Sequence, residues 1–305
     1  MNLYLRFAKR FSLLLTPLVA TSVLFTSPSQ AATFAFSEGE LLLEKFSGVL
    51  SGEFGVDNSA ENVALTNGSD DSVNLNNNPI NQTSLQEVFT FGQSTANGKG
   101  RNYFGLAGTD ATIVGNFDIE ANQTFAFDFS SFLNQETKID TPIAENAQAS
   151  SDVAFYLFDT SDIPVDGLSN LINNLLDNPS SINRNPFAFF SLAGNLSTLG
   201  EDSINQNGQG ITLSNDFSNI TSNGNEEFAT ASFAGSFQRY FNNPANVTLI
   251  ATRRSQARVT APEPSTSLAL LLFLALLVIA NKGRLRENIL GRSYEVKVIK
   301  LTVED

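Results

Sequence analysis

Residues 124–129, TFAFDF, place Phe125, Phe127 and Phe129 on one face of an extended chain. Side chains alternate between the two faces of a β-strand, so this period of two predicts a half-buried strand. Short apolar runs of the same kind recur along the chain. They occupy residues 87–92, 103–105, 111–119, 153–158, 187–192, 228–237 and 247–252. The body is therefore expected to be built from many short strands.

Turn-forming pairs separate these runs, among them Asn97-Gly98, Asn207-Gly208 and Asn223-Gly224. Many short strands joined by polar turns predict a mainly β fold, an antiparallel, jelly-roll-like β-sandwich. Phenylalanine is the main large core residue, with 26 in the chain, and most of those in the body are expected in the core. Residues 33–36 fit a first strand, and residues 40–48 fit either a strand or a helical turn. Residues 57–82 are rich in Asn, Asp, Ser and Gly, which favours turns and mobile loops.

One segment, residues 165–177, has a different period. Its apolar residues are spaced as on one face of a helix, and they are Leu168, Leu171, Ile172, Leu175 and Leu176. This pattern predicts one short amphipathic helix, with Asp166 as its N-cap and Pro179 beyond its end. The helix is expected to cover an end or a face of the sandwich, and a partner-binding helix is the alternative.

The composition excludes several kinds of chemistry, because the chain has no His, no Cys and no Trp. Ordinary zinc, copper and iron–sulfur sites need His or Cys ligands, and Ser-His-Asp or Cys-His catalysis needs the same residues. No cofactor is expected. A pair of carboxylates could still hydrolyse glycosides, but no pair stands out among the acids of the body. The sequence therefore favours a non-enzymatic protein.

The body is strongly acidic, with 26 acidic and nine basic residues between Ala32 and Ala261. Such a surface repels nucleic-acid phosphates, so no nucleic-acid partner is expected. Three arginines, Arg253, Arg254 and Arg258, form a local basic cluster. They are expected on a solvated edge strand, or as a contact for the acidic groups of a matrix polymer.

Two ligand sites are possible on this body. Asp70-Asp71 lies near several asparagines, Asn67, Asn76, Asn77 and Asn78, whose oxygens suit Ca²⁺, although a solvated loop explains the same residues. A carbohydrate-binding module is the second possibility, because sandwiches often bind sugars. Sugar stacking needs exposed aromatic rings, and the body has three tyrosines and no Trp, so this function depends on phenylalanines outside the core.

The first 31 residues have the features of a secretory signal peptide. Arg6, Lys9 and Arg10 precede an apolar run over residues 11–25, and Ser29-Gln30-Ala31 supplies the small residues of a cleavage box. Cleavage is expected between Ala31 and Ala32. The extracytoplasmic body then spans residues 32–260.

Residues 261–286 combine three features in a fixed order. A Pro262-Glu263-Pro264-Ser265 box comes first, and 13 apolar residues follow over 268–280. The basic residues Lys282, Arg284 and Arg286 close the segment and are expected on the cytoplasmic side. The apolar run predicts a transmembrane helix with the apolar residues Leu268, Leu271, Leu272, Phe273, Leu274, Leu276, Leu277, Val278 and Ile279. Such a helix is ~20 Å long against a hydrocarbon core of ~30 Å, which favours a temporary anchor.

This box, apolar run and basic cluster resemble the PEP-CTERM sorting signal of Gram-negative bacteria. The resemblance implies Sec-dependent export, processing near the box by an exosortase-like membrane enzyme, and a place at the cell surface or in the extracellular matrix. It also implies a link with exopolysaccharide and biofilm, and it covers only about 26 residues. Residues 287–305 continue beyond the usual end of the signal, and this predicted cytoplasmic tail has no assigned role. A permanently anchored single-pass membrane protein is the alternative.

Overall fold

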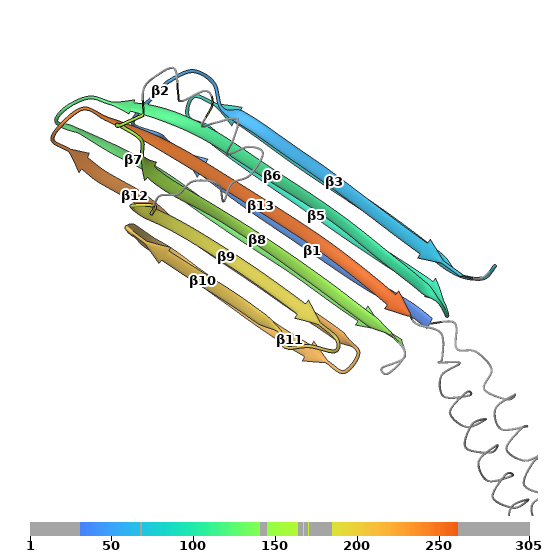
Figure 1. Ribbon diagram of the computed structural model, residues 1–305. Coiled ribbons are helices and arrows are strands. Elements are labelled where there is room, and N and C mark those ends of the chain that lie inside the picture. The colour runs from blue at the N-terminus through green and yellow to red at the C-terminus, as the bar shows by residue number, and fades with distance from the viewer. Residues whose placement is uncertain are drawn as a thin grey trace, which may run out of the picture. The chain divides into compact units, whose positions relative to one another are not determined.

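The computed structural model describes residues 31–67, 69–140, 145–163, 167, 170 and 185–261, and these residues are mainly β-strand. No helix among them is both long and apolar enough to cross a membrane. Figure 1 shows long strands running side by side. They are β1 (Ala31–Glu44), β2 (Val49–Leu50), β3 (Gly55–Thr66), β4 (Ser72–Ser84), β5 (Glu87–Gly100), β6 (Tyr103–Ile119), β7 (Gln123–Ile139), β8 (Asn146–Asp159), β9 (Ala188–Ser197), β10 (Ser203–Gln209), β11 (Ile211–Asn223), β12 (Glu226–Phe241) and β13 (Ala245–Ala261).

The strands form two antiparallel sheets that pack face to face in a sandwich-like arrangement. Sheet A has the order β11-β12-β7-β1-β5-β4. Sheet B has the order β10-β9-β8-β13-β6-β2, and β3 pairs with β6 beside β2. The predicted mainly β, antiparallel fold is therefore confirmed. The ambiguous residues 40–48 continue β1 as a strand as far as Glu44.

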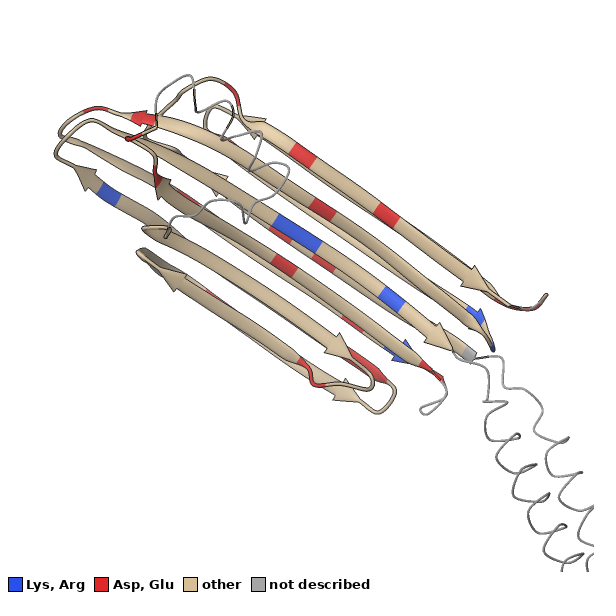
Figure 2. Ribbon diagram, viewed as in Figure 1, with Lys and Arg blue, Asp and Glu red and all other residues tan. Residues whose placement is uncertain are grey.

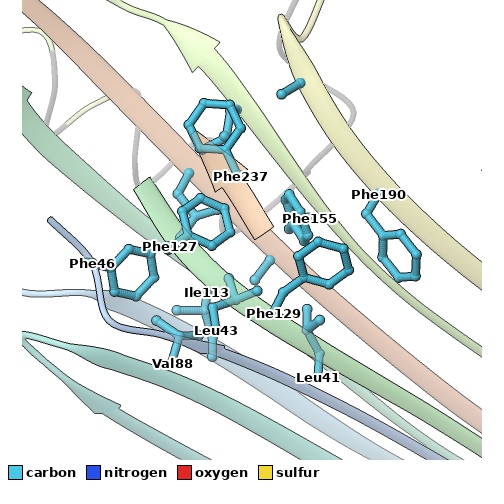
Figure 3. Packing of buried hydrophobic residues seen from close by; sticks show 14 of the residues in the cluster. Leu41, Leu43, Phe46, Val88, Ile113, Phe127, Phe129, Phe155, Phe190 and Phe237 are labelled. Carbon is cyan, nitrogen blue, oxygen red and sulfur yellow. The ribbon is translucent and has the colours of Figure 1, made fainter. Parts of the chain in front are cut away.

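The main core lies between the sheets and is rich in phenylalanine (Figure 3). Phe125, Phe127 and Phe129 of β7 are all buried, as their period of two predicts. Phe127 contacts Phe155 of β8 edge to face, with ring centroids 5.3 Å apart. Phe129 also contacts Phe155 edge to face, with ring centroids 5.1 Å apart. These ring contacts cross from sheet A to sheet B and hold the two layers together.

Small hydroxyl side chains join the sheets where the phenylalanines end. Ser37 Oγ of β1 donates to the Ser150 carbonyl of β8 at 2.6 Å. Ser94 Oγ of β5 donates to the Ser255 carbonyl of β13 at 3.0 Å, and Ser255 Oγ donates to the Gly92 carbonyl at 2.9 Å. A hydroxyl reaches the backbone of the facing sheet because no large side chain separates the layers here. The sandwich is thus closely packed and polar along this belt.

The prediction of turns and mobile loops over residues 57–82 is wrong for most of the segment. Residues 55–66 form β3, which pairs with β6, and residues 72–84 form β4, which pairs with β5. Pairing with a complete neighbouring strand, distant in sequence for β3 and within a hairpin for β4, outweighs the local preference of Asn, Asp and Ser for turns. The segment can be polar because β3 and β4 are edge strands whose side chains largely face solvent.

The turn predictions have mixed outcomes. Asn223-Gly224 does join β11 to β12, with Gly224 at a φ of 68°. Asn97-Gly98 and Asn207-Gly208 lie inside β5 and β10, so those two predictions are wrong. A Cβ added at Gly98 would lie 2.0 Å from Cε2 of Tyr103, so this glycine of sheet A makes room for a buried aromatic ring of sheet B. A dipeptide alone does not distinguish that role from a turn.

Several predictions concern segments outside the described residues. These are the signal peptide up to residue 30, the Pro262–Ser265 box, the apolar run at 268–280, the basic residues after it and the tail at 287–305. The predicted amphipathic helix at 165–177 also lies outside them, except for positions 167 and 170.

Candidate functional site

The outward face of sheet A carries an ordered set of side chains that the sequence does not group. Burial alternates strictly along β1, β5 and β7, so every second residue of these strands faces outward. In β5 the outward residues include Phe89 and Phe91, and the inward ones are the small Thr90 and Gly92. Half of the described phenylalanines, 11 of 22, are not buried. The partly buried Phe54 and Phe187 also pack against the main core, so a narrow majority of the described phenylalanines contributes to the core, as expected.

The strand registers align these residues into rows that run across the sheet. One row, called here the aromatic row, crosses all six strands and consists of Ile80, Phe91, Glu40, Phe132, Ser232 and Phe217. Neighbouring strands lie ~4.8 Å apart, so the row is ~24 Å long. Ile80 and Phe217 at its two ends are 41% and 52% exposed. The aromatic row therefore presents aliphatic and aromatic side chains along one line across the sheet.

A polar row runs beside the aromatic row. Its members are Asn78, Gln93, Glu38, Asn134, Thr230 and Asn219. Two residues along a strand separate the rows, which is about 7 Å. Each of these side chains carries a hydrogen-bonding oxygen, and three of the six are asparagines. A third row beyond it contains Phe36, Glu136 and Phe228.

Three carboxylates on this face, those of Glu38, Glu40 and Glu136, are partly buried. Burial raises the pKa of Glu38, and the charge of Glu40 raises it further. Burial also raises the pKa of Glu40, which lies between Phe91 and Phe132 in the aromatic row. The pKa of Glu136 is raised by burial and by Glu226. These three carboxyl groups are therefore less hydrated than fully exposed acids on a protein surface.

A shallow hollow adjoins the rows at the end of β1. It has a volume of about 330 Å³, and its lining includes Glu44, Asp128, Ser130 and Ser214. Lys45 Nζ lies 3.2 Å from Glu44 Oε1 and 2.9 Å from Asp128 Oδ2. Both carboxylates of the hollow are therefore bound by one ammonium group.

The arginine cluster is divided by the alternation of β13. This strand lies between β6 and β8 in the interior of sheet B, so the predicted edge strand is wrong. Arg253 faces inward and is 1% exposed, while Arg254 and Arg258 face outward. Arg254 pairs with Asp110 at 3.4 Å, and Arg258 lies over the ring of Phe104 at 5.2 Å. Figure 2 shows basic residues along β13 and acidic residues on the strands beside it.

Buried Arg253 contacts both sheets. Its Nε donates to Thr90 Oγ1 at 3.2 Å, and its Nη1 donates to the Thr109 carbonyl at 3.0 Å and to Thr109 Oγ1 at 2.6 Å. Its guanidinium lies over Gly92, where an added Cβ would be 1.8 Å from Nη1. Burial lowers the pKa of Arg253 to about 10, so the side chain stays charged at neutral pH. This arginine therefore has a structural role.

The residues of the candidate calcium site do not all point to one place. Asp71 Oδ1 accepts a hydrogen bond from the Arg101 backbone N–H at 2.8 Å, next to the β5–β6 connection. Asn76 and Asn78 face outward on β4, whereas Asn77 faces the opposite way. Among the described residues, no group of three or more acidic side chains could hold a metal ion.

Ala31 is the first residue of β1 and pairs with Gly100, and Ala261 is the last residue of β13 and pairs with Tyr103. Both ends of the body thus lie near the β5–β6 connection, at one end of the sheets.

The sequence alone does not predict the rows on the outward face of sheet A, because they depend on the strand registers. No family model matches the chain, and no curated protein is significantly similar to it.

Proposed function

We propose that this protein is an exported, non-enzymatic glycan-binding protein of the cell surface or extracellular matrix, and that the outward face of sheet A is its glycan contact. The proposal combines the terminal export and sorting signals of the sequence with the aromatic and polar rows. The single observation that carries it is that the aromatic row and the polar row run side by side across sheet A. A line of ring surface about 7 Å from a line of amide and carboxylate groups suits an extended sugar polymer.

The charge of this face favours a neutral polymer. Glu38, Glu40 and Glu136 lie in or beside the two rows, and the nearby Lys138 is paired with Glu226. An anionic polysaccharide would be repelled by these carboxylates, and the basic residues on the opposite sheet are paired or stacked. We therefore expect a neutral exopolysaccharide as the ligand class.

The body that presents this face is, in our proposal, a jelly-roll-like sandwich. The support is its connectivity, since the chain passes from one sheet to the other at most of its connections. Examples are β5 to β6, β6 to β7, β7 to β8 and β12 to β13.

Binding of the full chain to neutral and acidic exopolysaccharides tests the proposal. Phe91→Ala and Phe132→Ala should each weaken binding at least tenfold, because each removes a ring from the middle of the aromatic row. Phe104→Ala is the matched control, because Phe104 faces outward on sheet B, and it should bind as the wild type does. The proposal fails if no polysaccharide binds, or if Phe104→Ala loses as much affinity as the other two variants.

A carboxylate-based hydrolase is the second candidate function. Glu38 and Glu40 are next neighbours on one face of β1, about 7 Å apart along the strand, and both have a raised pKa. Glycosidases use two carboxyl groups at comparable separations. Release of reducing ends from a bound polysaccharide by the wild type, and its loss in Glu40→Gln, would favour this function over binding alone.

A further inference from the structure

Each side of the described body ends in two edge strands, one from each sheet. On one side β4 ends sheet A and β3 pairs only with β6 in sheet B. Asn77 of β4 donates through Nδ2 to the Glu61 carbonyl and to Asn62 Oδ1 of β3, at 2.9 and 3.1 Å. On the other side β11 ends sheet A and β10 ends sheet B, joined at Gly210 with a φ of 70°.

The two sides are complementary in direction. Neighbouring strands are antiparallel throughout both sheets, and sheet A contains six strands from one side to the other. The two outermost strands, β4 and β11, therefore run in opposite directions. The path from β10 through β9, β8, β13 and β6 to β3 also contains six strands, so β3 and β10 are opposite as well. A second copy set beside the first in the same orientation would place β11 antiparallel to β4 and β10 antiparallel to β3.

The edges lack the lysines that commonly protect native edge strands from such pairing. Charges, proline, β-bulges and shortness give the same protection, and of these β4 has Pro79 and β11 has one bulge near its start. No Lys or Arg occurs in β3, β4, β10 or β11, and Figure 2 shows no basic segment on β3 or β10. The only charged residues are Asp57 and Glu61 of β3 and Asp216 of β11.

The two edge strands of sheet A match in length and chemistry. β4 and β11 are each 13 residues long, whereas in sheet B β3 has 12 residues and β10 has seven. Pro79 removes one donor from β4 but leaves residues 72–78 uninterrupted, and the bulge of β11 leaves residues 215–223 regular. Both strands present outward asparagines, such as Asn76 and Asn219, which can stack as amide ladders. Exposed apolar residues border the same edges, namely Val56, Leu65, Ile80, Leu213, Phe217 and Ile220.

We infer that the partner of these edges is a second copy of this chain, added head to tail so that both sheets continue from copy to copy. A contact between two different edges of one molecule is heterologous and leaves a free edge at each end, so it generates an open filament. Each copy adds six strands, so the expected axial repeat is ~29 Å. The aromatic and polar rows would continue along the filament, although the assembly does not depend on glycan binding.

Sedimentation velocity and negative-stain microscopy of the full chain in mild detergent test the inference, over a wide range of protein concentration. The wild type should form unbranched filaments. Asn219→Lys/Thr221→Lys blocks the β11 edge, and Asn74→Lys/Asn76→Lys blocks the β4 edge; neither variant should form filaments alone. The control is Thr230→Lys/Ser232→Lys on β12, which adds two lysines to the same face one strand inside the edge and should still polymerise.

An equimolar mixture of the two edge variants gives the sharper result. Each variant keeps one free edge, so the mixture should form dimers and nothing larger, which also shows that both variants are folded. The inference is overturned if the wild type stays monomeric at every concentration, if it stops at a closed dimer, or if the edge variants polymerise like the control.

Discussion

At the scale of single residues, the interior of this protein depends on close fits between glycine and large polar groups. Arg253 crosses from sheet B toward sheet A and rests where Gly92 has no side chain. It is 1% exposed and hydrogen-bonded to Thr90 and Thr109. A buried charge without such partners would cost several kcal/mol, so displacing the guanidinium disturbs both sheets.

Gly92→Ala should therefore lower the free energy of unfolding by about 2–3 kcal/mol, because overpacking forces the arginine away from its acceptors. Gly108→Ala is the matched control. It lies in β6, where an added Cβ would have no atom nearer than the Ser255 carbonyl at 3.9 Å, and it should change stability by less than about 0.5 kcal/mol. Urea unfolding of both variants measures the difference. Equal stability of the two would contradict the fit described for Arg253.

The acids of the aromatic and polar rows should make stability depend on pH. Burial raises the pKa of Glu38 and Glu40 above the ordinary value of 4.5, so the folded protein holds their protons more tightly than the unfolded chain. Stability from these two groups is full below the unfolded pKa and is lost as the pH rises through the folded pKa. The variant Glu38→Gln/Glu40→Gln should thus melt higher than the wild type at pH 7 and nearly equally at pH 4. A larger difference at pH 4 would contradict this assignment.

At the scale of elements, the edge strands β3 and β4 are held by tertiary contacts more than by their own sequence. β3 is mostly exposed and pairs on one side only. Asn77 joins it to β4 and also donates to the Gly108 carbonyl of β6 at 3.0 Å. β3 and β4 belong to different sheets and share no backbone hydrogen bonds, so the side-chain amide of Asn77 links them instead.

Asn77→Ala should destabilise the protein by about 1–2 kcal/mol, because it leaves main-chain acceptors of β3 and β6 without their donor. Asn76→Ala, one residue away on the exposed face of β4, should stay within about 0.5 kcal/mol of the wild type. Hydrogen exchange should show the faster opening of β3 in the first variant only. Uniform exchange changes over both sheets would argue against a local link.

At the scale of the whole molecule, the sorting box that we propose at Pro262–Ser265 would limit how the protein can be processed. The last strand ends at Ala261, and the Pro262–Ser265 box begins at the next residue. A processing enzyme that acts at the box would therefore cut within a few residues of the folded body. Cleavage after Ala31 would remove one residue from β1 and leave the rest of the strand intact.

The mature extracellular protein should begin at Ala32 and end near the box, as measured by intact mass. Loss of an exosortase-like enzyme, or the change Pro262→Ala/Pro264→Ala, should keep the protein in the membrane fraction. Residues beyond Arg286 in the extracellular form would refute sorting at the box. Retention in the membrane with the enzyme present would instead favour a permanent single-pass anchor.

The sequence by itself determined the strand period, the antiparallel β class, the Asn223-Gly224 turn and the inward face of β7. Each of these depends on residues close together in the chain, where alternation and turn chemistry act directly. Only the tertiary structure decided the strands of residues 57–82, the burial of Arg253 and the rows on sheet A. Strand pairing across long distances in sequence fixes which polar segments become edges and which residues align. The period of two marks the two faces of a strand but does not by itself fix which one is buried, since the phenylalanine face of β7 is buried whereas Phe89 and Phe91 of β5 face outward.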